Sequence, residues 1–207
     1  MRDRKNPRRF IIATGACLVL AACGEAPTAP ARSAPPVRTA ASLGTTSGGS
    51  VDTSYAVFVV NPLLRQTFSL TNGNKITFGA RAICDPLTSS YGPTEWDKPC
   101  DALLLPVTVK TLSWYDRDGH PHVEFSPRLR FNPAAEQVTL YLKDKNDLSA
   151  GYGINYCPDD GSACYDESIT DPSLTTYRST TSGNFYFRRI KHFSGYNIAS
   201  GRSEEAY

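Results

Sequence analysis

The chain has 207 residues, of which 40% are hydrophobic and 20% are charged, a composition typical of a globular protein. It carries 22 Lys and Arg against 20 Asp and Glu, but the first 22 residues hold five basic side chains and one acidic, which leaves 17 against 19. With no basic cluster beyond Arg188 to Lys191, this remainder gives nucleic-acid binding little support.

The N-terminus has the pattern of an export signal. Residues 1–10, MRDRKNPRRF, are basic, and the apolar stretch that follows, IIATGACLVLAA, is too short to span a bilayer as a mature helix. The stretch ends in LAAC, Leu20 to Cys23. These residues resemble the lipobox of the bacterial lipoprotein family, in which a large aliphatic residue and two small ones precede an invariant cysteine.

The lipoprotein resemblance covers the first 23 residues and implies a processing pathway. Residues 1–22 would be a signal peptide that is removed, and Cys23 would carry lipid on its thiol and its new amino group. Two or three acyl chains hold a protein at a membrane far more firmly than one. We therefore expect a lipid-anchored protein of the cell envelope, and Gly24 is compatible with the outer membrane. An ordinary secretory signal and an unprocessed anchor are the alternatives.

Residues 23–50 follow the signal as a linker rich in Pro, Ala, Ser, Thr and Gly. Such a composition cannot bury enough apolar surface to offset its ordering entropy, so we expect a disordered tether. A flexible chain of this length has a typical reach of roughly 30 Å.

Residues 51–201 are predicted to form one all-β domain, followed by a flexible tail at 202–207. Turn signals at Asn72 to Asn74 and Arg117 to Gly119 separate the strand-like segments. No amphipathic helix pattern is sustained, so we expect a single antiparallel β-sandwich. Apolar residues alternate with polar ones in four runs, at 76–82, 107–109, 123–125 and 138–142.

The cysteines agree with export. Of the six, Cys17 would leave with the signal and Cys23 would be lipidated, so four remain for an oxidising compartment. Four cysteines allow three pairings, and zinc is a further alternative, although their spacing is not that of zinc knuckles. We favour pairing of sequence neighbours, Cys84 with Cys100 and Cys157 with Cys164, because each pair brackets a local loop.

Both expected disulfide loops carry candidate binding residues. The first displays Tyr91 and Trp96, whose rings could hold a sugar or a partner's side chain, although Trp96 could instead fold over its own disulfide or the rim of the sandwich. The second is acidic and could form a weak cation site, although solvated loop charge explains it as well. Its carboxylates are Asp159, Asp160, Asp166 and Glu167.

A last motif is the tripeptide His192-Phe193-Ser194. The apolar phase of the preceding strand shifts after Phe185 and Phe187, which predicts a bulge near Arg188 and Arg189. Beyond this bulge, the histidine and serine would point inward, where each needs a hydrogen-bond partner.

At this motif the sequence resembles the ZU-five type of β-sandwich found in tight-junction scaffolds and netrin receptors. The resemblance rests on VEFSPRLRFNPAAEQVTLYLKD, residues 123–144, and on HFSGYNIA, residues 192–199. It implies a β-sandwich used mainly as an interaction module. Some members cut themselves in an HFS motif, so Ser194 would attack the carbonyl of Phe193 while His192 accepts its proton.

The sequence favours a non-catalytic function. We expect a lipid-anchored envelope protein without cofactor or enzymatic activity, which presents its domain to an unknown protein or glycan. Self-cleavage between Phe193 and Ser194, and carbohydrate binding through Tyr91 and Trp96, are the alternatives.

Overall fold

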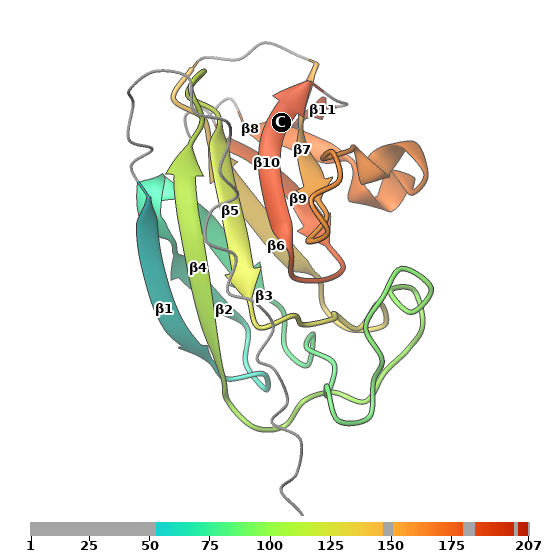
Figure 1. The fold of residues 1–207 in the computed structure, drawn as a ribbon. Coiled ribbons are helices and arrows are strands. Elements are labelled where there is room, and N and C mark those ends of the chain that lie inside the picture. Colours follow the sequence, from blue (N-terminus) through green and yellow to red (C-terminus); the bar gives the residue numbers. More distant parts are fainter. Residues whose placement is uncertain (1–52, 147–150, 180–184, 201–202, 207) are drawn as a thin grey trace, which may run out of the picture. The chain divides into compact units, whose positions relative to one another are not determined.

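Two facing β-sheets form the domain in the computed structural model (Figure 1), which describes residues 53–146, 151–179, 185–200 and 203–206. The predicted signal peptide, the lipidated Cys23 and the linker lie outside these residues. Among the described residues, no helix is long and apolar enough to cross a membrane.

The first sheet has five strands, all antiparallel, and the second has six. In spatial order the first sheet contains β1 (Ser54–Val60), β4 (Val107–Tyr115), β5 (Pro121–Ser126), β10 (Gly195–Ser200) and β7 (Tyr152–Cys157). In spatial order the second contains β11 (Ser203–Ala206), β8 (Thr176–Ser179), β9 (Phe185–Ile190), β6 (Val138–Lys143), β3 (Lys75–Phe78) and β2 (Gln66–Ser69). Three short 3-10 helices complete the described elements, η1 (Thr71–Gly73), η2 (Glu167–Ile169) and η3 (Pro172–Leu174). The predicted all-β sandwich is thereby confirmed.

Both predicted turns join neighbouring antiparallel strands. Asn72 and Gly73 have positive φ between β2 and β3, as does Gly119 between β4 and β5. In the second turn, the carboxylate of Asp116 accepts hydrogen bonds from the backbone N–H groups of Asp118 and His120. Asn-Gly and Asp-Gly fit these turns because they reach positive φ at low cost.

Strand β9 differs from the sequence prediction. It pairs one-for-one with β6 from Phe185 to Ile190, so the predicted bulge near Arg188 and Arg189 is wrong. Tyr186, Arg188 and Ile190 point into the sandwich, whereas Phe187 lies on the outer face. The prediction used Phe185 and Phe187 to define the inward face and needed a bulge to bring Ile190 to that face. In the structure, Ile190 shares the inward face with Tyr186 and Arg188 in a regular strand.

The C-terminal boundary also differs from the expected one. The flexible tail was predicted from residue 202, whereas β11 (Ser203–Ala206) pairs in parallel with β8 at the edge of the second sheet. This is a parallel pair in an otherwise antiparallel second sheet.

The core lies between the sheets and is centred on aromatic side chains. Phe193 is completely buried, its ring stacked on that of Phe125 at 4.4 Å and meeting those of Phe131 and Phe78 edge to face. The middle residue of the HFS tripeptide is therefore a core residue, and its position is fixed by packing on all sides.

Two chain segments cross between the sheets side by side. Residues 127–137 lead from β5 to β6, and residues 191–194 lead from β9 to β10. The N–H of Phe131 donates to the carbonyl of Lys191 at 2.8 Å, and the N–H of Phe193 donates to the carbonyl of Leu129 at 2.7 Å. The HFS tripeptide thus lies in a corner where the chain changes sheets, not on a regular strand.

The disulfides are the two that were predicted. Cys84 is bonded to Cys100 and Cys157 to Cys164, across sequence separations of 16 and 7 residues. All four sulfurs are therefore consumed, which removes the zinc alternative for these cysteines.

Candidate functional site

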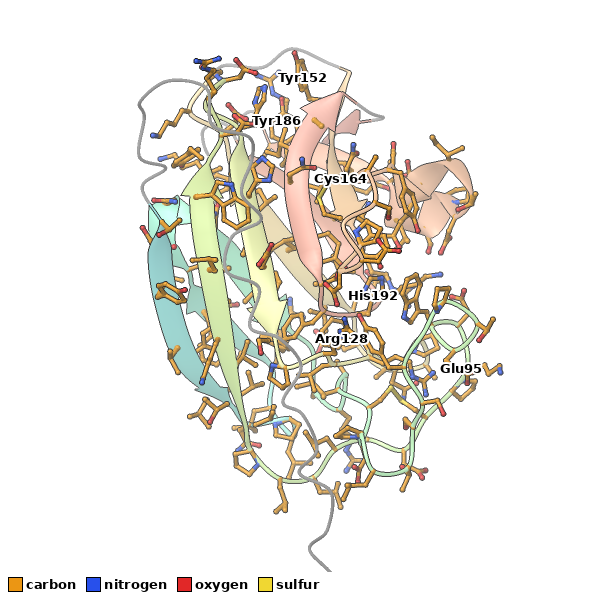
Figure 2. All side chains as sticks on the ribbon, in the orientation of Figure 1. Glu95, Arg128, Tyr152, Cys164, Tyr186 and His192 are labelled. Atoms are coloured by element: carbon orange, nitrogen blue, oxygen red, sulfur yellow. A yellow bond between two sulfur atoms is a disulfide. The ribbon has the colours of Figure 1, made fainter. Side chains whose placement is uncertain are left out.

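Three segments that are distant in the sequence meet at the corner formed by residues 191–194. Besides residues 191–194 themselves, they are the disulfide loop at 84–100 and the segment at 157–167. Figure 2 shows the labelled His192 between Glu95 of the disulfide loop and Cys164 of the segment at 157–167. Lys191 fastens the corner further by ion pairs with Asp97 and Asp171. The sequence had singled out each segment separately, and the structure brings them together.

His192 is completely buried among aromatic rings. Its ring stacks on that of Trp96 with 3.7 Å between the centroids, and the ring of Tyr156 meets it edge to face at 4.8 Å. The nearest polar atoms lie at the outer limit of hydrogen bonding, the hydroxyl of Tyr91 at 3.4 Å from Nδ1 and Oε1 of Glu167 at 3.5 Å from Nε2. Packing more than hydrogen bonding therefore holds this ring in place.

Ser194 is paired with a carboxylate and not with His192. Its hydroxyl donates to Oδ1 of Asp159 at 2.7 Å, and the carbonyl oxygen of Cys157 lies 3.1 Å from it. The other oxygen of Asp159 accepts from Nε of Arg128 at 2.6 Å. The ZU-five resemblance implied that His192 accepts the serine proton. In the structure the acceptor of the Ser194 hydroxyl is Asp159.

Two tyrosine hydroxyls cap the carbonyl groups of the tripeptide. Tyr91 donates to the carbonyl of Phe193 at 2.5 Å, and Tyr196 donates to the carbonyl of His192 at 2.7 Å. Burial raises the pKa of the Tyr91 phenol, and the charge of Asp159 raises it further. Burial likewise raises the pKa of Tyr196. Both phenols therefore stay protonated and keep their donor roles.

Arg188 and Glu167 form a buried ion pair beneath the histidine. The guanidinium is completely buried and bonds both to the carboxylate of Glu167 and to the carbonyl of Ile154, the latter at 2.7 Å. Burial alone would raise the pKa of Glu167, but the contact with His192 and the charge of Arg188 outweigh it and lower this pKa. The sequence analysis did not identify Arg188 as a site residue. Its position two residues from both Tyr186 and Ile190 places it on the same face of the strand as these buried residues, and this spacing could have indicated its burial.

The two aromatic residues that were predicted to bind a ligand are largely engaged by the protein itself. Trp96 is only 7% exposed, and one face of its indole is covered by His192. Tyr91 is half-buried and its hydroxyl is bonded to the backbone at Phe193. Ligand binding by Tyr91 and Trp96 therefore stays a prediction, and it would require Trp96 to leave its stacking contact with His192.

The acidic segment does not gather its carboxylates. Asp159 pairs with Arg128, and Glu167 pairs with Arg188. Asp160 and Asp166 accept hydrogen bonds from the backbone N–H groups two residues further on. In the part of the chain that the structure describes, no group of three or more His, Cys, Asp or Glu side chains is arranged to hold a metal ion.

Comparison of the chain with family models, with curated proteins and with solved structures finds no match. The lipoprotein and ZU-five resemblances therefore stay predictions from short motifs.

Proposed function

We propose that the chain is an exported, lipid-anchored protein of the cell envelope whose β-sandwich is a non-catalytic interaction module. The lipobox at Leu20 to Cys23 supports the anchor. The two disulfides agree with an oxidising compartment outside the cytoplasm.

The observation that carries the non-catalytic role is the engagement of the site by the protein itself. His192, Phe193 and Ser194 are each at most 2% exposed. Two hollows beside the first disulfide loop have volumes of about 20 and 400 Å³, and neither is lined by His192 or Ser194. A substrate from solution would have to displace this packed cluster before it met a nucleophile.

The lipid anchor is tested by Cys23→Ser. We expect the wild-type chain to partition into detergent and the variant to remain aqueous, because lipid on this thiol supplies the membrane affinity. Globomycin treatment of the expression host should make the unprocessed precursor of the wild type accumulate.

Cys17→Ser is the matched control, since this cysteine lies in the same apolar stretch but outside the lipobox. It should partition like the wild type. Unchanged processing and partitioning of the Cys23→Ser variant would disprove the lipoprotein assignment.

Self-cleavage is a second candidate function, favoured by the hydrogen bonds at Phe193 and Ser194. The Ser194 hydroxyl would attack the Phe193 carbonyl carbon, Asp159 would take the hydroxyl proton, and Tyr91 would stabilise the negative oxygen. The C–N bond would then break as Asp159 returns the proton to the Ser194 nitrogen, leaving a free amine and an ester between the Phe193 acyl group and the Ser194 oxygen. Water would hydrolyse this ester.

Hydroxylamine separates the two candidates because it attacks the ester but not the intact peptide bond. Under the non-catalytic proposal, denaturing electrophoresis shows one uncut chain with or without hydroxylamine. Ser194→Ala then costs about 0.5–1.5 kcal/mol of unfolding free energy, since Asp159 loses one hydrogen bond but stays partly exposed and paired with Arg128. A fragment beginning at Ser194, absent from Ser194→Ala and Asp159→Asn, would establish self-cleavage.

A further inference from the structure

Strand β1 presents an unusual combination of exposure and apolar character. Its sequence, SYAVFVV, contains no charge, proline or glycine. Every second side chain points outward, and Tyr55, Val57 and Val59 are 71%, 63% and 57% exposed. Exposed apolar rows of this kind are typical of surfaces that are covered in the functional state.

This row lies on an open edge of the first sheet. Among the described residues, β1 pairs only with β4, and it forms the edge at the left of Figure 1. An edge strand directs alternate N–H and C=O groups away from its sheet, and natural edges are usually protected by charges, prolines, bulges or covering loops. Strand β1 carries no charge and no proline. It also has no bulge, because it pairs with β4 one-for-one over all seven residues.

The other edge strand of the same sheet, β7, is protected by hydrogen bonds from other parts of the chain. On β7, the N–H of Ile154 donates to the hydroxyl of Thr176 at 2.9 Å. Tyr156 exchanges two backbone hydrogen bonds of 2.9 Å with Tyr165. The edge at β7 is therefore covered by Thr176 of β8 and by Tyr165, whereas within the part of the chain that the structure describes the seven-residue strand β1 is paired on one side only.

We propose that β1 pairs antiparallel with β1 of a second copy of the chain, around a two-fold axis at Val57, and joins two five-stranded sheets into one. Centring the axis there overlaps all seven residues and sets Tyr55 opposite Val59 of the second copy. The three exposed side chains of each copy then form one apolar row of six. In a two-fold interface the same surface of each copy must fit the other, and an apolar strand fits an identical apolar strand.

Charge favours this occupant. In this two-fold pair, position 57 of one copy faces position 57 of the other, so a charge there would face the same charge, and β1 has no charge at that position or at any other. The nearest charge on the same face is Lys110 of β4, which lies opposite Val57 in the register of the two strands. In the paired sheet the two Lys110 residues are three strand spacings apart, about 14 Å. This exceeds the Debye length of about 8–10 Å at moderate salt.

The membrane anchor would strengthen a pair that is small by itself. One strand pair buries less surface than a standard interface, so the association in dilute solution should be weak. Confinement of both copies to one membrane raises their effective concentration. The two β1 strands each span about 24 Å and start at opposite ends of the pair, within the reach of the predicted tethers. This inference rests on the proposed lipid-anchored interaction module and names its partner.

Val57→Cys in the full-length exported chain tests the contact. Opposed residues of an antiparallel pair have Cα atoms about 4.5–5.5 Å apart, which suits a disulfide. We expect a disulfide-linked dimer on a non-reducing gel of membranes. Thr108→Cys is the matched control, because Thr108 is exposed on the same face one strand inward and should give monomer.

A charge exchange separates specific pairing from general adhesion. Val57→Lys and Val57→Glu each place like charges at the axis and should abolish co-purification of two differently tagged copies. Co-expression of the lysine form with the glutamate form should restore it. Both substitutions are at an exposed edge position, so both chains should still fold. Lys110 lies opposite this position, so the lysine form should unfold slightly more easily than the glutamate form.

Three results would overturn the proposal. They are a Val57→Cys chain that stays monomeric like the Thr108→Cys control, a disulfide to a protein of different mass, and a lysine–glutamate pair that fails to co-purify. The mass of the Cys23 peptide is read in the same samples. Intact lipidation without pairing refutes this inference alone, whereas unlipidated Cys23 refutes the proposed anchor.

Discussion

Glu167→Ala is expected to lower the free energy of unfolding by about 3–5 kcal/mol, because it leaves a buried charge uncompensated. Arg188 is completely buried, and its guanidinium also donates to the carbonyl of Ile154 at 2.7 Å. Urea unfolding of the wild type and the variant at neutral pH measures the loss. A difference below 1 kcal/mol would contradict the buried ion pair.

A double substitution distinguishes the pair from the packing around it. Replacing Glu167 with leucine and Arg188 with methionine removes both charges and keeps apolar volume, which is often neutral or stabilising at buried pairs. The double variant should therefore be more stable than Glu167→Ala, and the cycle of single and double variants gives the coupling energy. Strictly additive losses would show that the two side chains act independently.

The stabilisation of the folded chain by the Arg188–Glu167 pair should depend on pH in the acidic range. The pKa of Glu167 in the folded chain lies below the ordinary value of 4.5, because the contact with His192 and the charge of Arg188 outweigh the effect of burial. The unfolded chain therefore binds the proton more readily than the folded chain. The stabilisation is complete above pH 4.5 and is lost as the pH falls through the folded value. The difference between wild type and Glu167→Ala should shrink over this acidic range.

Trp96→Ala is the second substitution with a large expected effect. It should cost about 3–5 kcal/mol, as for other buried aromatic residues, because it opens a cavity above His192. The indole stacks on the imidazole at 3.7 Å and meets Tyr156 edge to face at 5.7 Å. Thermal and urea unfolding measure the change.

Leu87→Ala is the control within the same disulfide loop. Leu87 is 91% exposed, so its truncation should change the unfolding free energy by less than about 0.5 kcal/mol. If Trp96→Ala were as neutral as Leu87→Ala, the buried position of Trp96 would be contradicted. If the same variant also abolished binding on a glycan array, carbohydrate binding through Tyr91 and Trp96 would be supported.

Local chemistry made much of the fold predictable. Alternation of apolar and polar residues identified the segments that became β3, β4, β5 and β6, and Asn-Gly and Asp-Gly marked two hairpins. The disulfides were predictable because each closes a short loop between strands that follow one another in the sequence. These features depend on interactions within a few residues of the chain.

The candidate site depended on topology and was less predictable. His192, Trp96 and Glu167 come from three segments whose meeting requires the chain to cross between sheets after β9. A periodic pattern also favours the outside for a charged residue, so it gave no indication that Arg188 is buried. Its burial is explained by the carboxylate of Glu167, and no spacing rule connects those two positions.

The most direct test of the account is the mass of the exported wild-type chain under denaturing conditions, where strand pairing cannot hide a nick. A lipid-anchored, non-catalytic sandwich predicts one species, Cys23 to Tyr207 with its acyl chains and two disulfides. A chain that still begins at Met1 would contradict the anchor. Two masses that divide the chain between Phe193 and Ser194 would contradict the non-catalytic role.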